Sequence, residues 1–422
     1  MIDNIKLANY KSFFADQVKE AIDEQQKINR SQMRNLFKTG ELSLAYVDSI
    51  QHETGMIILK CPRRMAPRLK VLKGVCIIKK GAKQALGEHV TEWICRWDEF
   101  VDNKDFHSSG SDMTPMYYVH TGDSNYDYVA CSGFSFKLYD ILSKALVDGK
   151  SLSLIVHNPF PPVEYFRNLA SYMDAFSSND ELNLEPTIDY EEWTPEELAF
   201  DEQKPTGISD TIIDTLANEH CCIVQGPPGT GKSYTIASVI SSYLDAGKTV
   251  CVTTMANKGL IELIKQKPLQ KYVKEGRVSK TNLSIDERKQ VSGVKAASAD
   301  LQVPGGEMLC ATNYQLSSVF SEKKMTLYGL PQYDLVVIEE ASQAFLTAIV
   351  AFKQLGIDWL IVGDPMQLPP IVKLNNPQYN SWNVATQVEG LKSMVLGTSI
   401  KSYRIVTTFR LTSRSASLTK YF

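Results

Sequence analysis

One eight-residue stretch has the residue types and the spacing needed to hold a chain of phosphates. It comprises Gly226, Pro227, Pro228, Gly229, Thr230, Gly231, Lys232 and Ser233, and it fits the pattern G-x-x-x-x-G-K-[ST]. The glycines let the backbone turn so that successive N–H groups face the phosphates, the lysine adds a positive charge, and the serine hydroxyl is a ligand for Mg²⁺. The stretch predicts a phosphate-binding loop.

The flanking residues predict the structure that such a loop requires. The apolar run at 221–225 predicts a buried strand, and the apolar residues from 234 to 244 recur at helical spacing. The loop therefore joins a strand to the N-terminus of a helix, where the helix dipole also favours a bound anion. A chance match to the pattern is the alternative, and these flanks disfavour it.

Composition and charge limit the classes of protein that remain. The formal net charge of -3 gives no global sign of a nucleic-acid binder, so any such surface must be local. The eight cysteines include no C-x-x-C pair, which favours a reducing compartment and argues against structural zinc. We see no secretory signal and no apolar run long enough for a membrane span. We therefore expect a soluble, intracellular, cytoplasmic protein with no membrane partner.

The N-terminal half predicts two kinds of structure. Residues 1–40 have loosely helical apolar spacing, and residues 41–136 contain several short runs of period two that predict a small antiparallel barrel or sandwich. Aromatic side chains in the second segment either stack bases or fill the barrel core, and the core is favoured. Residues 137–203 return to helix and then become acidic, which predicts a surface connector. A regulatory mimic of nucleic acid is the less favoured alternative for the acidic part.

The residues after the phosphate loop predict a doubly wound α/β domain over 204–396. Buried strands at 249–253, 308–312, 333–338 and 359–362 alternate with helical segments, which is typical of a parallel sheet with helices on both faces. The strand at 333–338 ends in two adjacent carboxylates, Glu339 and Glu340. Such a pair suits nucleotide hydrolysis, because one acid can help to hold Mg²⁺ and the other can orient water.

A basic segment follows the second of these strands. Residues 265–295 contain nine Lys and Arg against three acids. Phosphate contact and a solvated helical surface are both compatible with this balance. If the segment contacts phosphates, we expect Lys271, Lys274 and Arg277 to flank a nucleic-acid strand together with the barrel.

Four stretches of the second half together resemble the motifs of superfamily 1 helicases, specifically the Upf-like, 5′-to-3′ branch. They are GPPGTGKS at 226–233, VVIEEASQ at 336–343, VGDPMQLPP at 362–370 and TTFRL at 407–411. The resemblance implies a first RecA-like ATPase domain over 204–396, preceded by stalk helices and a small β-barrel. It implies that 397–422 begin a second, incomplete RecA-like domain.

The resemblance also implies a role for each motif residue. Lys232 and Ser233 would bind the phosphates of ATP and Mg²⁺, and Glu339 would share the metal with Ser233. Glu340 would polarise the attacking water, Gln367 would sense the γ-phosphate, and Arg410 would be the arginine finger. Thr254, Asn257 and Thr312 fall where the family places contacts to the nucleic-acid strand.

Three departures from the family pattern change these expectations. The family has Asp-Glu where this chain has Glu339-Glu340, so we expect slower hydrolysis. The adenine-reading glutamine would fall near Ser209, where there is none, which leaves base selectivity open. The sequence stops at Phe422. We therefore expect residues 397–422 to be poorly packed or irregularly docked, and this chain alone not to unwind a duplex.

The sequence thus favours an ATP-dependent helicase or translocase that acts on single-stranded DNA or RNA, completed by further C-terminal domains or a protein partner. The alternative is a nucleotide-gated nucleic-acid-binding or scaffold module with weak or no ATPase. A metabolic kinase is disfavoured, because the GDPMQLPP stretch and Arg410 have no role in one.

Overall fold

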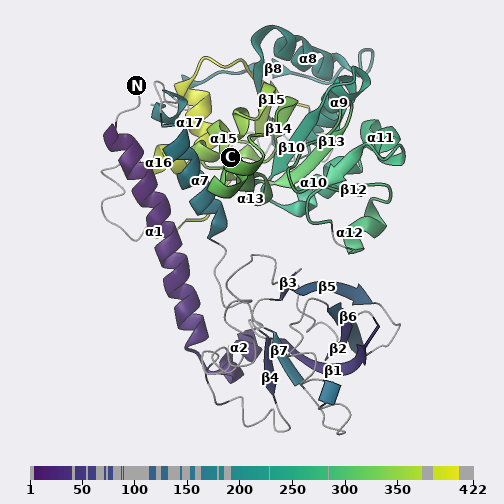
Figure 1. Cartoon of the computed structure of the whole chain (residues 1–422). Coiled ribbons are helices and arrows are strands. Elements are labelled where there is room, and N and C mark those ends of the chain that lie inside the picture. The colour runs from purple at the N-terminus through teal and green to yellow at the C-terminus, as the bar shows by residue number, and fades with distance from the viewer. Residues whose placement is uncertain are drawn as a thin grey trace, which may run out of the picture. The chain divides into compact units, whose positions relative to one another are not determined.

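The structure, a computed structural model, describes most of the second half of the chain and parts of the first (Figure 1). The described residues are 4–39, 43–53, 56–62, 71–72, 75–78, 87, 89, 114–119, 125–131, 143–144, 153–156, 163–177, 180–184, 192–227, 229–283, 285–372 and 384–407. Contacts divide the chain into two compact units. Unit 1 comprises Met1–Val18 and Val163–Phe422, and unit 2 comprises Lys19–Pro162.

A parallel sheet forms the centre of unit 1. Its described strands lie in the order β12-β11-β13-β10-β14-β15-β9-β16-β8. In chain order their bounds are β8 Glu196–Leu198, β9 Cys221–Gln225, β10 Val250–Thr254, β11 Val278–Lys280, β12 Lys295–Ala296, β13 Met308–Thr312, β14 Tyr333–Ile338, β15 Gly356–Gly363 and β16 Ser402–Ile405. Every described pairing among them is parallel, so all the strands end at one edge, which we call the carboxyl edge.

Helices cover both faces of this sheet, and the predicted α/β fold of RecA-like type is confirmed. On one face lie α8 Gly207–Glu219, α9 Lys232–Asp245, α10 Asn257–Ile264, η3 Lys267–Leu269 and α11 Gln270–Lys274. On the other lie α1 Asn4–Asn29, through its first turns, with α7 Glu164–Ala175, η1 Asp180–Asn183, α13 Asn313–Leu316, η4 Ser317–Phe320, η5 Ala341–Gln343, α15 Leu346–Lys353, α16 Val384–Val388 and α17 Gly390–Gly397. Two short helices, α12 Ile285–Gln290 and α14 Glu322–Leu327, complete the unit.

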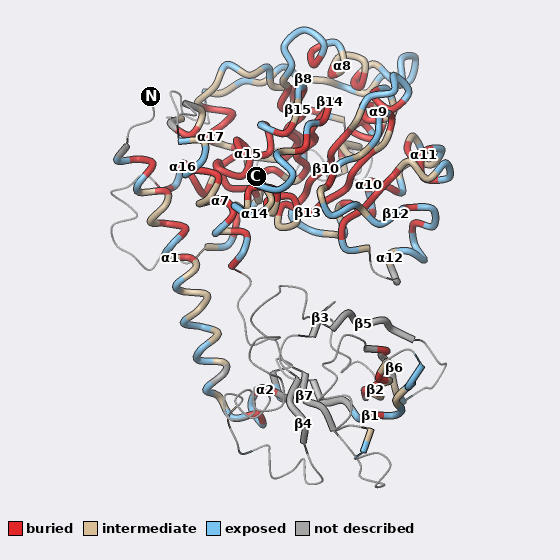
Figure 2. Tube along the Cα trace, viewed as in Figure 1, coloured by how far each residue is buried: buried red, intermediate tan, exposed pale blue. Residues whose placement is uncertain are grey.

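The sheet is apolar on both sides because successive strand residues face opposite helical layers. In β9, Cys222 and Val224 pack in one buried cluster and Ile223 packs in the other. Figure 2 shows the central strands of unit 1 as almost entirely buried. This double burial explains why the strands appear in the sequence as continuous apolar runs. Among the described helices, none combines the length and the apolar character needed to cross a membrane.

The first turns of α1 belong to the core of unit 1. Phe13 and Phe14 are fully buried, and their ring centroids lie 6.0 and 5.5 Å from that of Phe345, which precedes α15. Tyr165 and Phe166 of α7 lie 6.0 Å from the same ring. One aromatic cluster therefore joins the first turns of α1 and of α7 to the start of α15.

Two short strands at the end of the sheet differ from expectation. β8 lies within the acidic stretch that we expected to be a surface connector, and it pairs with β16, which in turn pairs with β9. The Phe200 amide donates to Thr407 Oγ1 at 2.8 Å and closes the same edge. The sheet therefore extends past residue 396, the expected domain end, and residues 402–405 are ordered in it because β9 offers them an unpaired edge. Arg410 and Pro228 lie outside the described residues.

Unit 2 contains an antiparallel sheet with described strands in the order β3-β5-β6-β2-β1-β7-β4. Their bounds are β1 Ser43–Gln51, β2 Met56–Pro62, β3 Val71–Leu72, β4 Val75–Ile78, β5 Thr114–Val119, β6 Tyr126–Cys131 and β7 Ser153–Val156, and α2 Met33–Thr39 precedes them. Antiparallel pairing agrees with expectation, whereas closure into a barrel stays a prediction. Of the aromatic side chains at issue, the structure describes Tyr126 and Tyr128, which are half-buried and have Lys60 Nζ 4.2 and 5.8 Å from their ring centres.

We predict that Phe13→Ala destabilises unit 1 by about 3–5 kcal/mol, because it leaves a cavity in the aromatic cluster. Chemical denaturation followed by near-UV circular dichroism measures the change. The matched control is Ile5→Ala in the same helix, where the side chain is 70% exposed and the expected change is within about 0.5 kcal/mol. Equal midpoints for Phe13→Ala and the parent chain would show that α1 is not part of this core.

Candidate functional site

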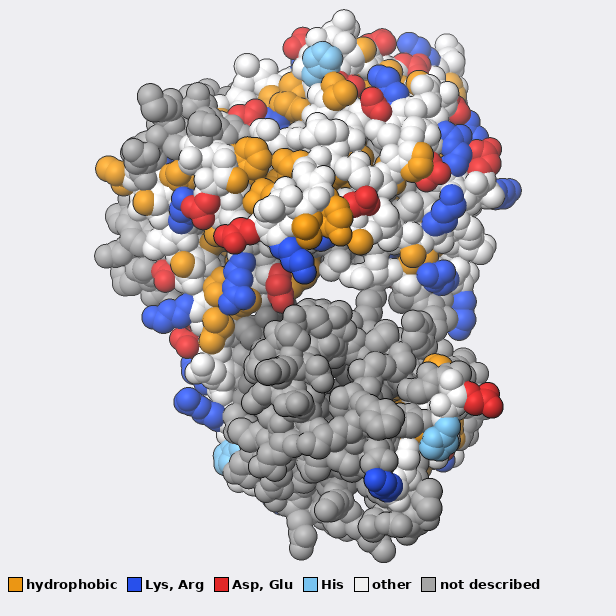
Figure 3. All heavy atoms as spheres, viewed as in Figure 1, with side chains coloured by type: hydrophobic (Ala, Val, Ile, Leu, Met, Phe, Trp, Pro, Cys, Tyr) orange, Lys and Arg blue, Asp and Glu red, His pale blue; other side chains and the backbone are white. Residues whose placement is uncertain are grey.

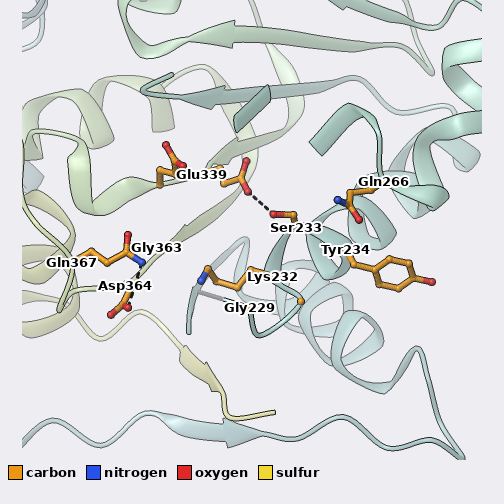
Figure 4. A pocket seen from close by; sticks show the side chains of 11 residues that line it. Gly229, Lys232, Ser233, Tyr234, Gln266, Glu339, Gly363, Asp364 and Gln367 are labelled. Atoms are coloured by element: carbon orange, nitrogen blue, oxygen red, sulfur yellow. Dashed lines mark hydrogen bonds between the residues drawn. The ribbon is translucent and has the colours of Figure 1, made fainter. Parts of the chain in front are cut away.

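The phosphate loop borders a cavity of about 630 Å³ at the carboxyl edge of the sheet. The cavity is lined by Gly229, Gly231, Lys232, Ser233, Tyr234, Gln266, Glu339, Glu340, Gly363, Asp364 and Gln367. Most of these residues come from α9 and from the ends of β9, β14 and β15, which lie side by side in the sheet, and Gln266 comes from the link between α10 and η3. Figure 4 shows Ser233 facing Glu339, with Lys232 extending from the loop toward Asp364 and Gln367. Motifs that are far apart in the sequence thus meet around one space.

The backbone of the loop requires its glycines. Gly229 and Gly231 have φ values of 90° and 80°, a region that residues with a side chain rarely adopt. A Cβ atom on Gly226 would lie 2.8 Å from Thr230 Oγ1 and 3.2 Å from the carbonyl of Ile405. The turn itself is fixed by Thr230 Oγ1, which donates to the Pro227 carbonyl at 2.9 Å. The loop is consequently a formed cradle rather than a flexible link.

The charge at the centre of the cradle is Lys232. Its Nζ donates to the carbonyl of Pro227 at 3.0 Å and to that of Gly226. Burial lowers the pKa of Lys232, and the nearby carboxylates of Asp364, Glu339 and Glu340 oppose that shift. A phosphate chain would supply the same kind of opposite charge at closer range, so the site favours an anionic ligand beside this ammonium.

Ser233 and Glu339 form the expected metal pair. Ser233 Oγ donates to Glu339 Oε1 at 3.1 Å. The second oxygen, Oε2, is buried without a hydrogen-bond partner in the described part of the chain, and burial raises the pKa of Glu339 to about 7. A hydroxyl and a carboxylate with a spare buried oxygen are the donors that Mg²⁺ prefers. The side chains therefore fit a Mg²⁺ site, and the extra methylene of Glu339, compared with Asp, does not keep the carboxylate from Ser233.

Glu340 differs sharply from its neighbour. Its backbone lies in the left-handed region with φ 51°, which is uncommon for a residue with a side chain and is typical of functional sites. Its Oε2 accepts a hydrogen bond from Thr254 Oγ1 at 3.1 Å. Gly259, in the first turn of α10, leaves room for that hydroxyl, because a Cβ atom on it would lie only 3.1 Å from Thr254 Oγ1. The strained turn thus directs the second carboxylate toward the end of β10.

Gln367 completes the group of residues expected at the cavity. Its Nε2 donates to Asp364 Oδ2 at 3.5 Å, a contact drawn in Figure 4. Asp364 was not assigned a role from the sequence, although it lies in the quoted GDPMQLPP stretch. Tyr234 and Gln266 were also missed. The only sequence signal for Tyr234 is its place directly after Ser233, and Gln266 has none.

The adenine-reading glutamine of the family pattern would fall near Ser209, and the structure places this serine outside the cavity lining. Ser209 is buried in the first turn of α8, and its hydroxyl donates to the carbonyl of Thr206 at 2.8 Å. Neither residue lines the cavity.

The three residues that we expected to contact the nucleic-acid strand lie together at the carboxyl edge. They differ in how far their side chains are exposed and already hydrogen-bonded. Thr254 and Thr312 are register partners of β10 and β13, and both side chains are buried. Thr254 bonds Glu340, and Thr312 Oγ1 caps α13 by accepting from the Gln315 amide at 3.3 Å. Asn257 is half-buried and starts α10. Of the three, Asn257 is best placed to contact a ligand.

The basic segment divides between the two edges of the sheet. Arg277 immediately precedes β11, and its guanidinium donates to the carbonyls of Gly306 and Leu244 at 2.7 Å. Lys271 is ion-paired with Asp245, at the end of α9, at 2.7 Å. These contacts lie at the amino ends of the strands, opposite the cavity. The structure therefore does not bring Lys271 and Arg277 to the carboxyl edge, contrary to expectation.

The basic residues of α12 have a different position. Arg288 and Lys289 follow Glu287, whose carboxylate lies 3.4 Å from Nζ of Lys280, the last residue of β11. Figure 3 shows Lys and Arg side chains along the α11 and α12 side of unit 1, mixed with Asp and Glu. If this segment contacts phosphates, the α12 residues are better placed for it.

Comparisons with known proteins match the part of the chain that contains the cavity. A family model described as an AAA domain matches residues 209–373. The Schizosaccharomyces pombe protein "DNA replication ATP-dependent helicase/nuclease dna2" is 31% identical over 209 residues, which cover 47% of this chain and 14% of that protein. The Arabidopsis thaliana protein "DNA replication ATP-dependent helicase/nuclease JHS1" is 19% identical over 258 residues, or 60% of this chain and 17% of that protein.

A solved structure is similar over a longer range but only weakly. It is titled "Crystal structure of Arterivirus nonstructural protein 10 (helicase)" and has a TM-score of 0.30 and 12% identity, over 74% of this chain and 50% of that one. The chain spans 14% and 17% of the lengths of the two curated relatives named above.

We predict that Lys232→Ala abolishes binding of a non-hydrolysable ATP analogue while the fold survives, because it removes a phosphate-facing charge from a loop outside the packed clusters. The measurement is the rise in melting temperature with ligand, which follows RT ln(1 + [L]/Kd) for a ligand that binds only the folded form. Lys248→Ala, an exposed lysine just after α9, is the control and should keep the full rise. Equal stabilisation of Lys232→Ala and the parent would place the nucleotide elsewhere.

Proposed function

We propose that this chain, whose RecA-like region is that of a superfamily 1 helicase of the Upf-like branch, couples ATP hydrolysis to movement along single-stranded nucleic acid. One observation carries the proposal. The phosphate loop, both carboxylates and Gln367 line a single cavity, and Glu340 in that cavity is hydrogen-bonded to Thr254 at the expected strand-binding edge. A group that would hydrolyse ATP is thus in direct contact with the end of β10, three residues before Asn257, which is the best placed to meet the nucleic-acid strand.

Each side chain has a distinct part in this proposal. Lys232 and the loop amides bind the phosphates, and Ser233 and Glu339 hold Mg²⁺. When bound, the metal would neutralise charge that develops on the phosphate oxygens. Glu340 orients the attacking water and accepts its proton, and Gln367 contacts the terminal phosphate. Arg410 would act as the arginine finger from a second RecA-like domain.

The contact between Thr254 and Glu340 supports coupling between the two ligands. A strand that engages the end of β10 changes the surroundings of Thr254, and Glu340 changes its hydrogen bonding with it. ATP turnover would then depend on the strand. The relatives are named as DNA replication enzymes, so we propose single-stranded DNA as the strand, with RNA as the comparison substrate.

A nucleotide-gated module with little hydrolysis is the second candidate, and Glu339 is the observation that favours it. Burial raises the pKa of Glu339 to about 7, so Mg²⁺ would compete with a proton for this carboxylate near neutral pH. A neutral carboxyl group is a poor metal ligand. In this case ATP binding would persist and change strand affinity, while turnover stayed weak.

We predict that Glu340→Gln retains ATP binding and lowers turnover by about 10²–10⁴-fold, the usual contribution of a general base. Glu339→Asp should preserve or raise turnover if the carboxylate at this position serves the metal. The assay is steady-state ATP hydrolysis with and without a single-stranded oligonucleotide. The exposed Glu322→Gln in α14 is the charge-matched control and should hydrolyse ATP at the parent rate.

Two results would contradict parts of this assignment. Turnover by Glu340→Gln at the parent rate would mean that the base is another group. A parent chain that binds ATP without hydrolysing it, with or without the strand, would favour the nucleotide-gated module.

A further inference from the structure

The most completely buried charge at the carboxyl edge belongs to Lys280, which the mechanism above does not use. The side chain is 0% exposed at the end of β11. Its Nζ lies 2.7 Å from Asn257 Oδ1, 3.1 Å from the Thr281 carbonyl and 3.4 Å from both carboxylate oxygens of Glu287. Three acceptor groups therefore match the three N–H donors of the ammonium, which a buried charge requires.

This contact determines the orientation of the Asn257 amide. An ammonium group only donates hydrogen bonds, so the amide atom beside it must be Oδ1 rather than Nδ2. The NH₂ group then points away from Lys280. Among the described residues, none accepts a hydrogen bond from it. Asn257 thus presents a donor that the described part of the chain leaves unused.

The position of that donor indicates what it would meet. Asn257 is the first residue of α10. It lies three residues after Thr254, which ends β10 at the carboxyl edge. The N-terminus of α10 has no side-chain cap. Its backbone N–H groups and the helix dipole therefore favour a hydrogen-bond acceptor, as the NH₂ group of Asn257 does. Phosphate and base oxygens of a nucleic-acid strand are acceptors of this kind.

Lys280 also contacts two helices, α10 and α12, that would flank the nucleic-acid strand. Its partner Glu287 lies in α12, the helix that carries Arg288 and Lys289. One buried ammonium therefore holds both the start of α10 and α12 against the end of β11.

We propose that Lys280 is a positioning residue for strand binding, which keeps the Asn257 NH₂ group directed toward a single strand. The proposal rests on the proposed function. A purely structural lysine would also fill this space, but its removal would lower the stability of the fold without changing the strand affinity of the folded protein.

The test is a double-mutant cycle of Lys280→Met and Asn257→Ala in the full chain, with fluorescence anisotropy of a labelled single-stranded oligonucleotide at fixed salt. Each single variant should weaken binding about five- to tenfold, the factor for one hydrogen bond. The double variant should bind no more weakly than Asn257→Ala alone, because Lys280 acts only through the orientation of the donor that Asn257→Ala removes. Factors that multiply in the double variant, or parent-like affinity of Lys280→Met, would overturn the proposal.

The matched control is Lys353→Met, which removes a second buried lysine. Lys353 is 4% exposed and lies at the end of α15, with Nζ 2.6 Å from Glu181 and 3.3 Å from the ring centre of Trp359. This variant should lower the melting temperature while strand affinity stays within about twofold of the parent. A fall in strand affinity as large as that of Lys280→Met would show that any buried lysine gives the effect, and would overturn the proposal.

Asn257→Asp tests the same point where Lys280→Met fails to fold. An aspartate keeps an acceptor for Lys280, so the variant should melt at or above the parent temperature, yet it lacks the NH₂ donor and should bind the strand more weakly. Parent-like affinity of Asn257→Asp would overturn the proposal. A parent chain that binds no single strand would overturn the proposed function as well, whereas the other outcomes above concern Lys280 alone.

Discussion

The parallel pairing of β10, β14, β15 and β9 is the constraint on which the site depends. Because these strands run in one direction, the segments that follow them all begin at the same edge of the sheet. Residues 106 positions apart in the sequence can therefore meet, as Ser233 and Glu339 do. The register is fixed by apolar contacts on both faces. A slip by one residue in β14 would turn its buried residues to the opposite faces and move Glu339 away from the loop. The chemistry of the cavity is thus a consequence of how the sheet packs.

The sequence predicted the elements whose signals are local. The bounds of β9 and β13 agree with the predicted runs, because a strand buried on both faces is apolar at every position. The gathering of Lys232, Ser233 and Glu340 around one cavity was also predictable, since a phosphate loop and an acidic strand end can cooperate only at a shared edge. The left-handed turn at Glu340 was not, because nothing in its residue type requires it.

The features that sequence reasoning missed depend on distant partners. β8 and β16 are short, and the acidic β8 becomes a strand only because β16 lies beside it. Arg277 belongs to a basic stretch by composition, but its hydrogen bonds to backbone carbonyls place it at the amino ends of the strands. Lys280, in the same stretch, is fully buried. Charge counts along a sequence do not separate a solvated lysine from one enclosed between elements.

The aromatic cluster that joins α1 to α15 also has a consequence for how the protein is made. Phe13 and Phe14 are synthesised more than 300 residues before their ring partner Phe345. At translation rates of about 5–20 residues per second, these side chains wait on the order of tens of seconds for their place in the core. Unit 1 therefore cannot complete its aromatic core until Phe345 has been synthesised, and a chain that stops short of this residue leaves Phe13 and Phe14 without their ring partner.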